Sequence, residues 1–404
     1  NEQKMNKELK RLQAYPFQRL ANLLDGKSTR SKDRAITLTI GEPKHSPPDF
    51  VLEFFQDSSK LSAALGSYPA TRGLRSLRDS VAKFLGKRYN LKSSIDPERQ
   101  ILPVNGTREA LFAIAQCILS HKSTGLVLMP NPFYQIYEGA GILAGSDPYF
   151  INCFEDTNFL PNFEEVDAST WAKCELLYIC TPGNPSGAVI SMETMEYLIE
   201  LSDEHNFVIV SDECYSEIYH KETSPPPGIL QACDKLNRRS YKNCLVFNSL
   251  SKRSNLPGLR SGFVAGDAEL IENFLLYRTY HGSAMPLHHQ FVSALAWADE
   301  DHVAKNRSLY REKVSKVVKI LETVLSVPRP ECGFFLWPET PASDTQFSID
   351  LYEDTNTKIL PGSFLSRDTV SGNPGKNRVR LALVQPLEEC IEAAIRIKRF
   401  IKNS

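Results

Sequence analysis

The sequence predicts an α/β protein with a large domain, in which helices flank a mostly parallel sheet, and a smaller α+β domain. Between about residues 100 and 280, short apolar strand patterns alternate with helix patterns. Strands that alternate with helices form mostly parallel sheets with right-handed crossovers. The strand pattern of residues 207–212 begins with an unbroken apolar run, as expected when helices cover both faces of a sheet. After residue 266 the alternation ends, and longer helices with short strands follow.

The large domain is predicted from seven strands and the helices between them. Period counting places the strands at residues 101–104, 125–129, 149–153, 175–180, 207–212, 245–249 and 262–265. The helices are expected at residues 107–119, 134–143 and 192–205, and Ser191 is a good N-cap for the last of them.

The smaller domain is predicted from the C-terminal part of the chain. Helices are expected at residues 268–280, 287–297 and 302–325, and the prolines at 328 and 330 break the last one. Strands at residues 334–337, 346–350 and 378–384 precede a final helix at 387–401. We therefore divide the chain into an N-terminal arm (1–48), a large domain (49–290) and a small C-terminal domain (291–404). That the arm forms part of the small domain is implied by the family resemblance given below.

Composition and charge exclude several classes of function. Hydrophobic residues make up 42% of the 404 residues, as in a soluble globular protein. A net charge of −1 gives no electrostatic basis for binding nucleic acid or an acidic membrane surface. No apolar run is long enough to span a membrane, and the polar residues 1–11 are unlike a signal peptide. Nine cysteines without a C-x-x-C pair indicate reduced thiols in a cytoplasmic protein, and no metal site is expected.

One lysine carries the most specific chemical signal. Lys252 follows Ser249 and Ser251, and Arg260 comes eight residues later. This grouping suits a lysine that binds a phosphorylated aldehyde covalently, because hydroxyl groups and a planar guanidinium are good partners for phosphate oxygens. The alternative is an ordinary loop lysine among turn residues.

The segment of residues 249–262 resembles the active-site segment of the class I and II aminotransferases, which depend on pyridoxal phosphate (PLP) and have fold type I. Further matching motifs extend over nearly the whole chain: Gly41-Glu42-Pro43, Tyr68-Pro69-Ala70-Thr71-Arg72-Gly73, Asn105-Gly106-Thr107-Arg108, Pro130-Asn131-Pro132-Phe133-Tyr134, Asn184-Pro185-Ser186-Gly187, Ser211-Asp212-Glu213-Cys214-Tyr215 and Val379-Arg380-Leu381. The lysine segment, Tyr15-Pro16-Phe17 and residues 278–284 are similar to a narrower group, the succinyldiaminopimelate aminotransferases.

The resemblance implies roles around the cofactor ring. Lys252 would hold PLP and act as the general base. Asp212 would keep the pyridine nitrogen protonated, and Tyr215 and Asn184 would bind the phenolic oxygen of the ring. Tyr134 would stack on the ring. The residues alone also allow a structural alternative for each of these roles. Asp212 is then a helix N-cap, the motif that begins at Asn184 is a turn, and Tyr134 is a core residue.

Further roles concern the phosphate and the substrate. Because a helix N-terminus offers free N–H groups, the start of the helix at residue 107 is suited to phosphate. The resemblance assigns phosphate binding to Gly106, Thr107, Arg108, Ser249, Ser251 and Arg260, and to Tyr68 across a subunit boundary. It assigns the substrate α-carboxylate to Arg380, with Gly41 and Asn184 beside it, although Arg380 next to Arg378 also reads as a surface strand arginine. For distal substrate groups we expect the Arg72 and Lys44 regions.

The resemblance implies a cytoplasmic homodimer with composite active sites and ping-pong transamination. The expected donor is N-succinyl-LL-2,6-diaminopimelate and the expected acceptor 2-oxoglutarate, in lysine and diaminopimelate biosynthesis. Two alternatives share the same cofactor site: another class I or II amino-acid aminotransferase, and a PLP-dependent carbon–sulfur β-lyase. A non-enzymatic regulator would need a DNA-binding module, for which the N-terminal segment is too short.

Overall fold

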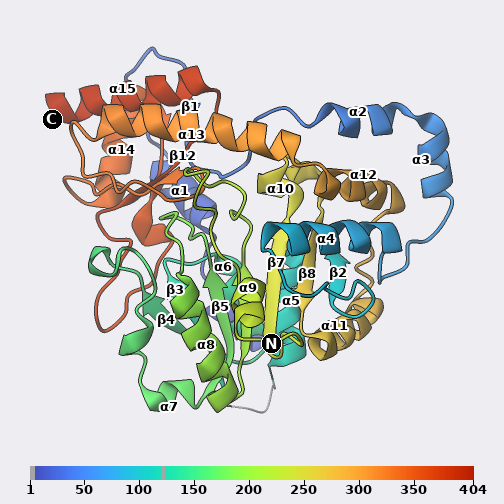
Figure 1. The fold of residues 1–404 in the computed structure, drawn as a ribbon. Coiled ribbons are helices and arrows are strands. Elements are labelled where there is room, and N and C mark those ends of the chain that lie inside the picture. Colours follow the sequence, from blue (N-terminus) through green and yellow to red (C-terminus); the bar gives the residue numbers. More distant parts are fainter. Residues whose placement is uncertain (1–4, 120–123) are drawn as a thin grey trace.

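A seven-stranded sheet forms the centre of the computed structural model, which describes residues 5–119 and 124–404 (Figure 1). Its order is β2-β8-β7-β6-β5-β3-β4. The strands are β2 (Ile101–Val104), β3 (Leu126–Asn131), β4 (Asp147–Asn152), β5 (Cys174–Cys180), β6 (Val208–Asp212), β7 (Cys244–Ser249) and β8 (Gly262–Gly266). The pairs from β4 through β7 are parallel, whereas β8 runs antiparallel to both β7 and β2. The predicted α/β class is confirmed.

Helices cover both faces of this sheet. Neighbouring residues of β3 enter different cores: Leu128 belongs to one, and Val127 and Met129 belong to the other. This alternation explains the apolar runs in the strand sequences. The helices of this part are α4 (Arg75–Arg88), α5 (Thr107–Ile118), α6 (Gln135–Leu143), α7 (Ala168–Trp171), α8 (Met192–His205), α9 (Ile229–Lys235), α10 (Leu250–Arg253), α11 (Ala268–His281) and α12 (Leu287–Ala298). Ser191 caps α8 as predicted, because its hydroxyl accepts from the N–H of Thr194.

The carboxyl ends of the central strands lie level with one another. Cys180 at the end of β5 pairs with Asp212 at the end of β6, and Asp212 pairs with Phe247 in β7. The loops that follow these strands therefore emerge at one edge, where open parallel sheets bind their ligands.

The C-terminal part forms a second layer with the N-terminal segment. It contains α13 (Asp301–Leu321), α14 (Asp344–Thr355) and α15 (Leu387–Asn403), which lie together at one end of the molecule in Figure 1. Its small antiparallel sheet has the order β11-β12-β9, formed by β11 (Leu360–Pro361), β12 (Val379–Ala382) and β9 (Phe335–Leu336). The N-terminal strand β1 (Ile36–Thr37) pairs in parallel with β10 (Thr357–Lys358), and α1 (Pro16–Leu24) packs nearby through Leu20. None of the described helices is long and apolar enough to cross a membrane.

Two predicted elements differ from the structure. The strand predicted at residues 346–350 is wrong, because this stretch lies inside helix α14. Its polar–apolar alternation is misleading: Phe347 and Leu351, four residues apart, are the side chains that reach the core. The long helix predicted to reach residue 325 ends at Leu321, before the two prolines.

The predicted boundary after residue 290 falls within α12. Val292, Ala296 and Trp297 of this helix belong to the core that α4 shares. We therefore propose that the large domain continues to the connection between α12 and α13. Of the predicted N-terminal arm, residues 1–4 lie outside the described residues. Helices α2 (Asp49–Gln56) and α3 (Ser58–Leu65) follow the arm and lie beside α12 (Figure 1).

Candidate active site

A cavity of about 450 Å³ opens at the carboxyl edge of the central sheet. This volume is within the range of sites that bind cofactors and other small molecules. Most of the residues predicted to bind PLP or substrate line it: Gly41, Thr107, Arg108, Tyr134, Asn184, Asp212, Tyr215, Ser249, Ser251, Lys252, Arg260 and Arg380. They come from strand ends, from helix starts and from the N-terminal segment, so residues from 41 to 380 are brought to one place.

Lys252 reaches this cavity from the short helix α10, directly after β7. Its Nζ donates a hydrogen bond to the carbonyl oxygen of Gly41 and lies 5.7 Å from the centre of the Phe334 ring. Removal from water lowers the pKa of Lys252 to about 8, and the positive charge of Arg380 acts in the same direction. A larger fraction of this amine than of an ordinary lysine is therefore unprotonated near neutral pH, as a nucleophile or a general base requires.

Asp212 ends β6 and is buried. Its Oδ2 accepts a 2.6 Å hydrogen bond from the hydroxyl of Tyr137, and its Oδ1 accepts one of 3.3 Å from the N–H of Cys214. Burial raises the pKa of Asp212, and these two donors oppose the rise. Tyr137 was missed in the sequence, although its place one helical turn after Tyr134 was a usable signal.

Tyr215 follows Asp212 by three residues and faces the same cavity. Its ring lies edge-on to Phe334 and Phe335, at 5.5 and 5.7 Å between ring centres. Tyr134 is half-buried, and its ring is perpendicular to that of Tyr137 at 5.8 Å. These aromatic contacts hold both tyrosines in fixed orientations at the cavity wall.

Gly106 and Arg260 are in direct contact at one end of the cavity. Gly106 has φ +80° and immediately precedes α5. A Cβ atom at Gly106 would lie 2.3 Å from Nη2 of Arg260, so only glycine leaves room for the guanidinium. Thr107 begins α5, and its Oγ1 is 3.2 Å from Sγ of Cys214. The free N–H groups of the helix, the guanidinium and the hydroxyl fit the phosphate of PLP.

The two serines of the lysine motif also line the cavity. Ser249 ends β7 and Ser251 belongs to α10, and both are buried. Arg108 lines the cavity too, and its Nη2 donates a 2.8 Å hydrogen bond to the hydroxyl of Tyr15. Tyr15, from the N-terminal arm, was not among the predicted site residues.

Arg380 enters from β12 and is only 5% exposed. Its Nη1 donates to Oδ1 of Asn184 at 3.1 Å, and its Nη2 donates to the carbonyl oxygen of Thr39 at 2.7 Å. Its Nε is enclosed and has no hydrogen-bond partner among the described residues. Burial lowers the pKa of Arg380 to about 10, which leaves it charged at neutral pH. The interpretation of Arg380 as a surface arginine is wrong.

Four predicted residues do not line the cavity of this chain: Gly106, which lies beside Arg260, and Tyr68, Lys44 and Arg72. The side chain of Tyr68 is fully exposed. Lys44 forms an exposed ion pair with Glu42, and Arg72 donates to the backbone carbonyl of Glu98. Of these residues, Glu42 alone borders the cavity.

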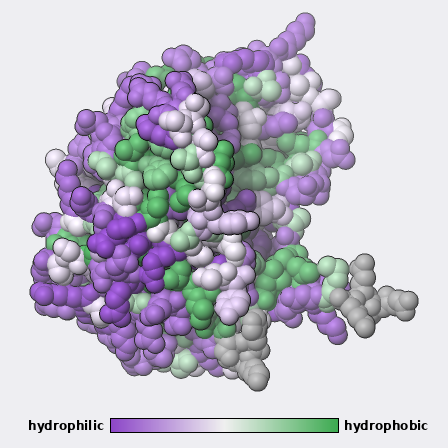
Figure 2. All heavy atoms as spheres, turned by 90° about the vertical axis from the view of Figure 1, so that its right-hand side faces the viewer, coloured by the Kyte–Doolittle hydropathy of each residue, from purple (hydrophilic) through white to green (hydrophobic). Residues whose placement is uncertain are grey.

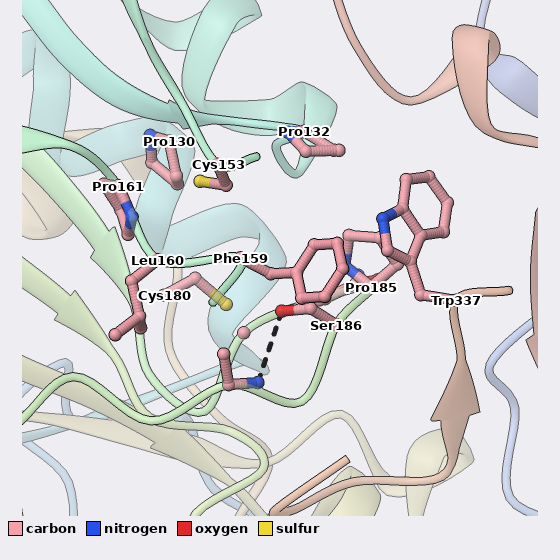
Figure 3. A pocket seen from close by; sticks show the side chains of 13 residues that line it. Pro130, Pro132, Cys153, Phe159, Leu160, Pro161, Cys180, Pro185, Ser186 and Trp337 are labelled. Atoms are coloured by element: carbon pink, nitrogen blue, oxygen red, sulfur yellow. Dashed lines mark hydrogen bonds between the residues drawn. The ribbon is translucent and has the colours of Figure 1, made fainter. Parts of the chain in front are cut away.

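A second, small apolar cavity lies behind the loop that carries Asn184 (Figure 3). It has about 20 Å³ of space, enough for one water molecule, and shares Cys180 and Asn184 with the large cavity. Phe159, Pro185 and Trp337 lie close together at one side of it in Figure 3. The loop is held by the N–H of Ala188, which donates to Oγ of Ser186 at 3.2 Å. Phe159 and Trp337 thus border the same small cavity as the loop that carries Asn184.

The fold and the residues gathered in the cavity are those of a PLP-dependent enzyme of fold type I. The family model for aminotransferase class I and II matches residues 33–397. An aminotransferase from Neisseria meningitidis Z2491 superposes with a TM-score of 0.92 at 45% identity, over 97% of this chain and 99% of that one.

Two further relatives carry more specific names. A probable N-succinyldiaminopimelate aminotransferase from Thermus thermophilus has a TM-score of 0.80 and 25% identity, over 95% of this chain and 98% of that one. An LL-diaminopimelate aminotransferase of Dehalococcoides mccartyi is 26% identical over 98% of this chain and 99% of its own length. This chain belongs to the class I and II aminotransferases, whose cofactor is PLP.

Proposed function

We propose that this aminotransferase transfers the amino group of a diaminopimelate-type amino acid to 2-oxoglutarate. The observation that carries the chemistry is the position of Lys252, a partly unprotonated amine in a cavity that also holds Asp212 and Arg380. PLP, when bound, supplies the electron sink that makes the α-proton of an amino acid acidic.

The residues of the chain then have separable tasks. The Lys252 amine takes a proton from the α-carbon of the substrate and returns it, as a general base and acid. Arg380 binds the α-carboxylate, because its buried guanidinium lines the cavity and a planar fork of donors suits a carboxylate. Asp212 supplies a buried carboxylate, and the hydrogen bond from Tyr137 favours its ionised form. The phosphate is bound by the start of α5 with Ser249, Ser251 and Arg260.

Two forms of the donor are proposed. N-succinyl-LL-2,6-diaminopimelate is expected from the sequence motifs and is supported by the name of the Thermus structure. Unmodified LL-diaminopimelate is favoured by the names of curated relatives such as that of Dehalococcoides mccartyi. The two donors differ at the far end of the molecule, where one has a succinyl carboxylate and the other an ammonium group.

The experiment compares kcat/KM for both donors, with 2-oxoglutarate as acceptor and glutamate formation as the signal. Aspartate, tyrosine and acetylornithine serve as competitors. A preference of tenfold or more for aspartate or tyrosine, about 1.4 kcal/mol, would contradict a diaminopimelate-type donor but not the reaction class. Lys252→Ala should lose about 10²- to 10⁴-fold in kcat with every donor, because it removes the general base.

Cystathionine tests the remaining alternative. A carbon–sulfur β-lyase would release pyruvate from cystathionine without any 2-oxo acid acceptor. We expect no pyruvate when 2-oxoglutarate is left out. Pyruvate formation at a rate comparable to transamination would move the enzyme to the lyases.

A homodimer remains a proposal, supported by one face of the molecule. Large apolar side chains are exposed on α2, α3, α11 and α12, and Figure 2 shows apolar patches on this side. They are Leu52, Leu65, Leu276, Phe291 and Leu295, with Tyr68 and Tyr280. Apolar exposure of this extent is typical of an interface. Sedimentation at micromolar concentration tests the dimer, and Tyr68→Phe should weaken PLP binding if Tyr68 reaches the phosphate across the interface.

A further inference from the structure

A buried lysine outside the cavity has no carboxylate partner. Lys313 of α13 is 3% exposed, and none of the ion pairs formed by the described residues includes it. Its Nζ lies 2.7 Å from Nε2 of His45 and 3.5 Å from the carbonyl oxygen of Val384. Burying an amine costs free energy unless its hydrogen bonds are made, so these contacts need an explanation.

The lysine fixes the direction of a chain of hydrogen bonds. An ammonium group can only donate, so Nε2 of His45 must accept and Nδ1 must carry the proton. Nδ1 lies 2.8 Å from Oδ1 of Asn306 and therefore donates to it. The amide of Asn306 is thereby oriented, and its Nδ2 donates to the backbone carbonyls of Lys252 at 3.1 Å and Arg253 at 3.3 Å.

These two carbonyls need a partner from elsewhere. They lie in the last turn of α10, which has only four residues, and the carbonyls of a last helical turn find no N–H donor within the helix. Asn306, Tyr310 and Lys313 are spaced along one face of α13, and the Tyr310 ring packs on His45 at 4.5 Å. A buried polar row of α13 is thus directed at the lysine segment.

The segment of residues 41–45 is connected both to the side chain and to the backbone of Lys252. The carbonyl oxygen of Gly41 accepts a hydrogen bond from Nζ of Lys252. His45, four residues later, is hydrogen-bonded to Asn306, which in turn donates to the backbone carbonyl of Lys252. The Phe335 ring packs so closely on Gly41 that a Cβ added there would lie 2.5 Å from it, so only glycine fits at this position. Residues 41–45 and α13 therefore close a ring of contacts around the lysine.

We propose that Asn306, His45 and Lys313 are positioning residues, which hold the backbone of Lys252 in register with Gly41 and so set the place of its amine. The proposal rests on the role of Lys252 in the proposed function. The general base must lie within hydrogen-bond reach of the α-proton, and small misplacements of reacting groups reduce kcat strongly. Substrate binding is not affected in the same way, because Arg380 lies on another element.

Asn306→Asp is the sharpest variant, since it keeps the shape and replaces the donor Nδ2 by an oxygen that repels both carbonyls. We expect kcat to fall by about 10- to 100-fold while the donor KM changes by about twofold or less. His45→Leu should behave in the same way. His45→Gln should restore most of the rate, because its amide can accept from Lys313 and donate to Asn306. Lys316→Gln, exposed on the same helix, is the control and should match the wild type.

The proposal is overturned if Asn306→Asp and His45→Leu retain wild-type kcat, or if His45→Gln loses as much as His45→Leu. If Asn306→Asp does not fold, the proposal is tested by the kcat values of His45→Leu and His45→Gln alone. A second readout is the pH profile of Lys252 acylation in the apoprotein, which should shift in His45→Leu and not in Lys316→Gln. A wild-type enzyme without transamination of any donor would contradict the proposed function instead, so the two failures are distinguishable.

Discussion

The hydroxyl of Tyr137 donates a 2.6 Å hydrogen bond to Oδ2 of Asp212. The Tyr137 ring is held by stacking on Tyr178, with ring centres 4.6 Å apart and planes 12° from parallel. Tyr178 is itself anchored, since its hydroxyl donates to the carbonyl oxygen of Leu111 at 2.6 Å. The phenol is therefore aimed at the carboxylate that the sequence predicts to face the pyridine nitrogen.

Tyr137→Phe should weaken catalysis through the pKa of Asp212. Burial raises this pKa and the tyrosine opposes the rise, so removing the hydroxyl makes Asp212 easier to protonate. A hydrogen bond to a charged group contributes about 1.5–3 kcal/mol, which corresponds to about a 10- to 100-fold loss of kcat/KM. The acid limb of the pH profile should move to higher pH. Tyr178→Phe is the control, because it keeps the ring stack; an unmoved acid limb in Tyr137→Phe would contradict the role.

Lys252 should react with acylating reagents at lower pH than surface lysines. The neutral amine is the nucleophile, and burial lowers the pKa of Lys252 to about 8. In the apoprotein its labelling rate should therefore rise through about pH 8 and level off, whereas ordinary lysines continue to gain reactivity up to about pH 10.4. Competitive labelling with mass spectrometry measures both in one sample. A Lys252 profile identical to that of the exposed lysines would show that the cavity does not desolvate the amine.

The strand ends explain why so much of the site was predictable from sequence. Asp212 and Ser249 each close an apolar run, and the carboxyl ends of parallel strands meet at one edge of a sheet. The fold class was predicted from the alternation of strand and helix patterns, and the family and cofactor from the resemblance of motifs along the chain; these predictions are confirmed. The individual roles of the site residues stay predictions.

What the sequence did not predict depends on contacts between distant segments. Tyr137 and Asp212 are 75 residues apart, and Arg380 reaches the carbonyl of Thr39 from 341 residues away. No periodic pattern encodes such a contact. The direction of β8 was also hidden, because an apolar strand reads alike in parallel and antiparallel pairing. In α14 a short polar–apolar alternation resembles a strand pattern. The segment is nevertheless a helix, and Phe347 and Leu351, one helical turn apart, are buried by tertiary packing.

Arg380→Lys should raise KM for every amino donor and 2-oxo acid, because all of them share the carboxylate next to the reacting carbon. Lysine keeps the charge but loses the planar fork of donors that contacts Asn184 and Thr39. We expect about a 10- to 100-fold increase, from the loss of about 1.5–3 kcal/mol of charged hydrogen bonding. Arg378→Lys is the control: Arg378 is also buried but bonds to Trp337 and Glu155 outside the cavity, so it should affect stability rather than KM. A loss confined to one donor would place Arg380 at the distal end of the substrate.

Gly106→Ala should weaken PLP binding by displacing Arg260. The added Cβ would lie 2.3 Å from Nη2 and 2.9 Å from Cζ of that guanidinium. The backbone of Gly106, at φ +80° and ψ 157°, is in a region almost restricted to glycine, which costs alanine about 1–3 kcal/mol. We expect the Kd of the apoprotein for PLP to rise by at least about tenfold, equivalent to 1.4 kcal/mol. Gly258→Ala, two residues before Arg260, is the control, because its Cβ would meet nothing within 4 Å.

A double-mutant cycle separates the clash from the backbone strain. In an Arg260→Ala background the guanidinium is already absent, so Gly106→Ala can then add only the cost of its positive φ. If Gly106→Ala lowers PLP affinity equally with Arg260 present and with Arg260→Ala, Arg260 does not bind the phosphate through the space beside Gly106. Apoprotein melting temperatures, measured alongside, report the backbone strain by itself. If the loss of PLP affinity on Gly106→Ala becomes small in the Arg260→Ala background, the absence of a side chain at Gly106 is what allows Arg260 to reach the cofactor.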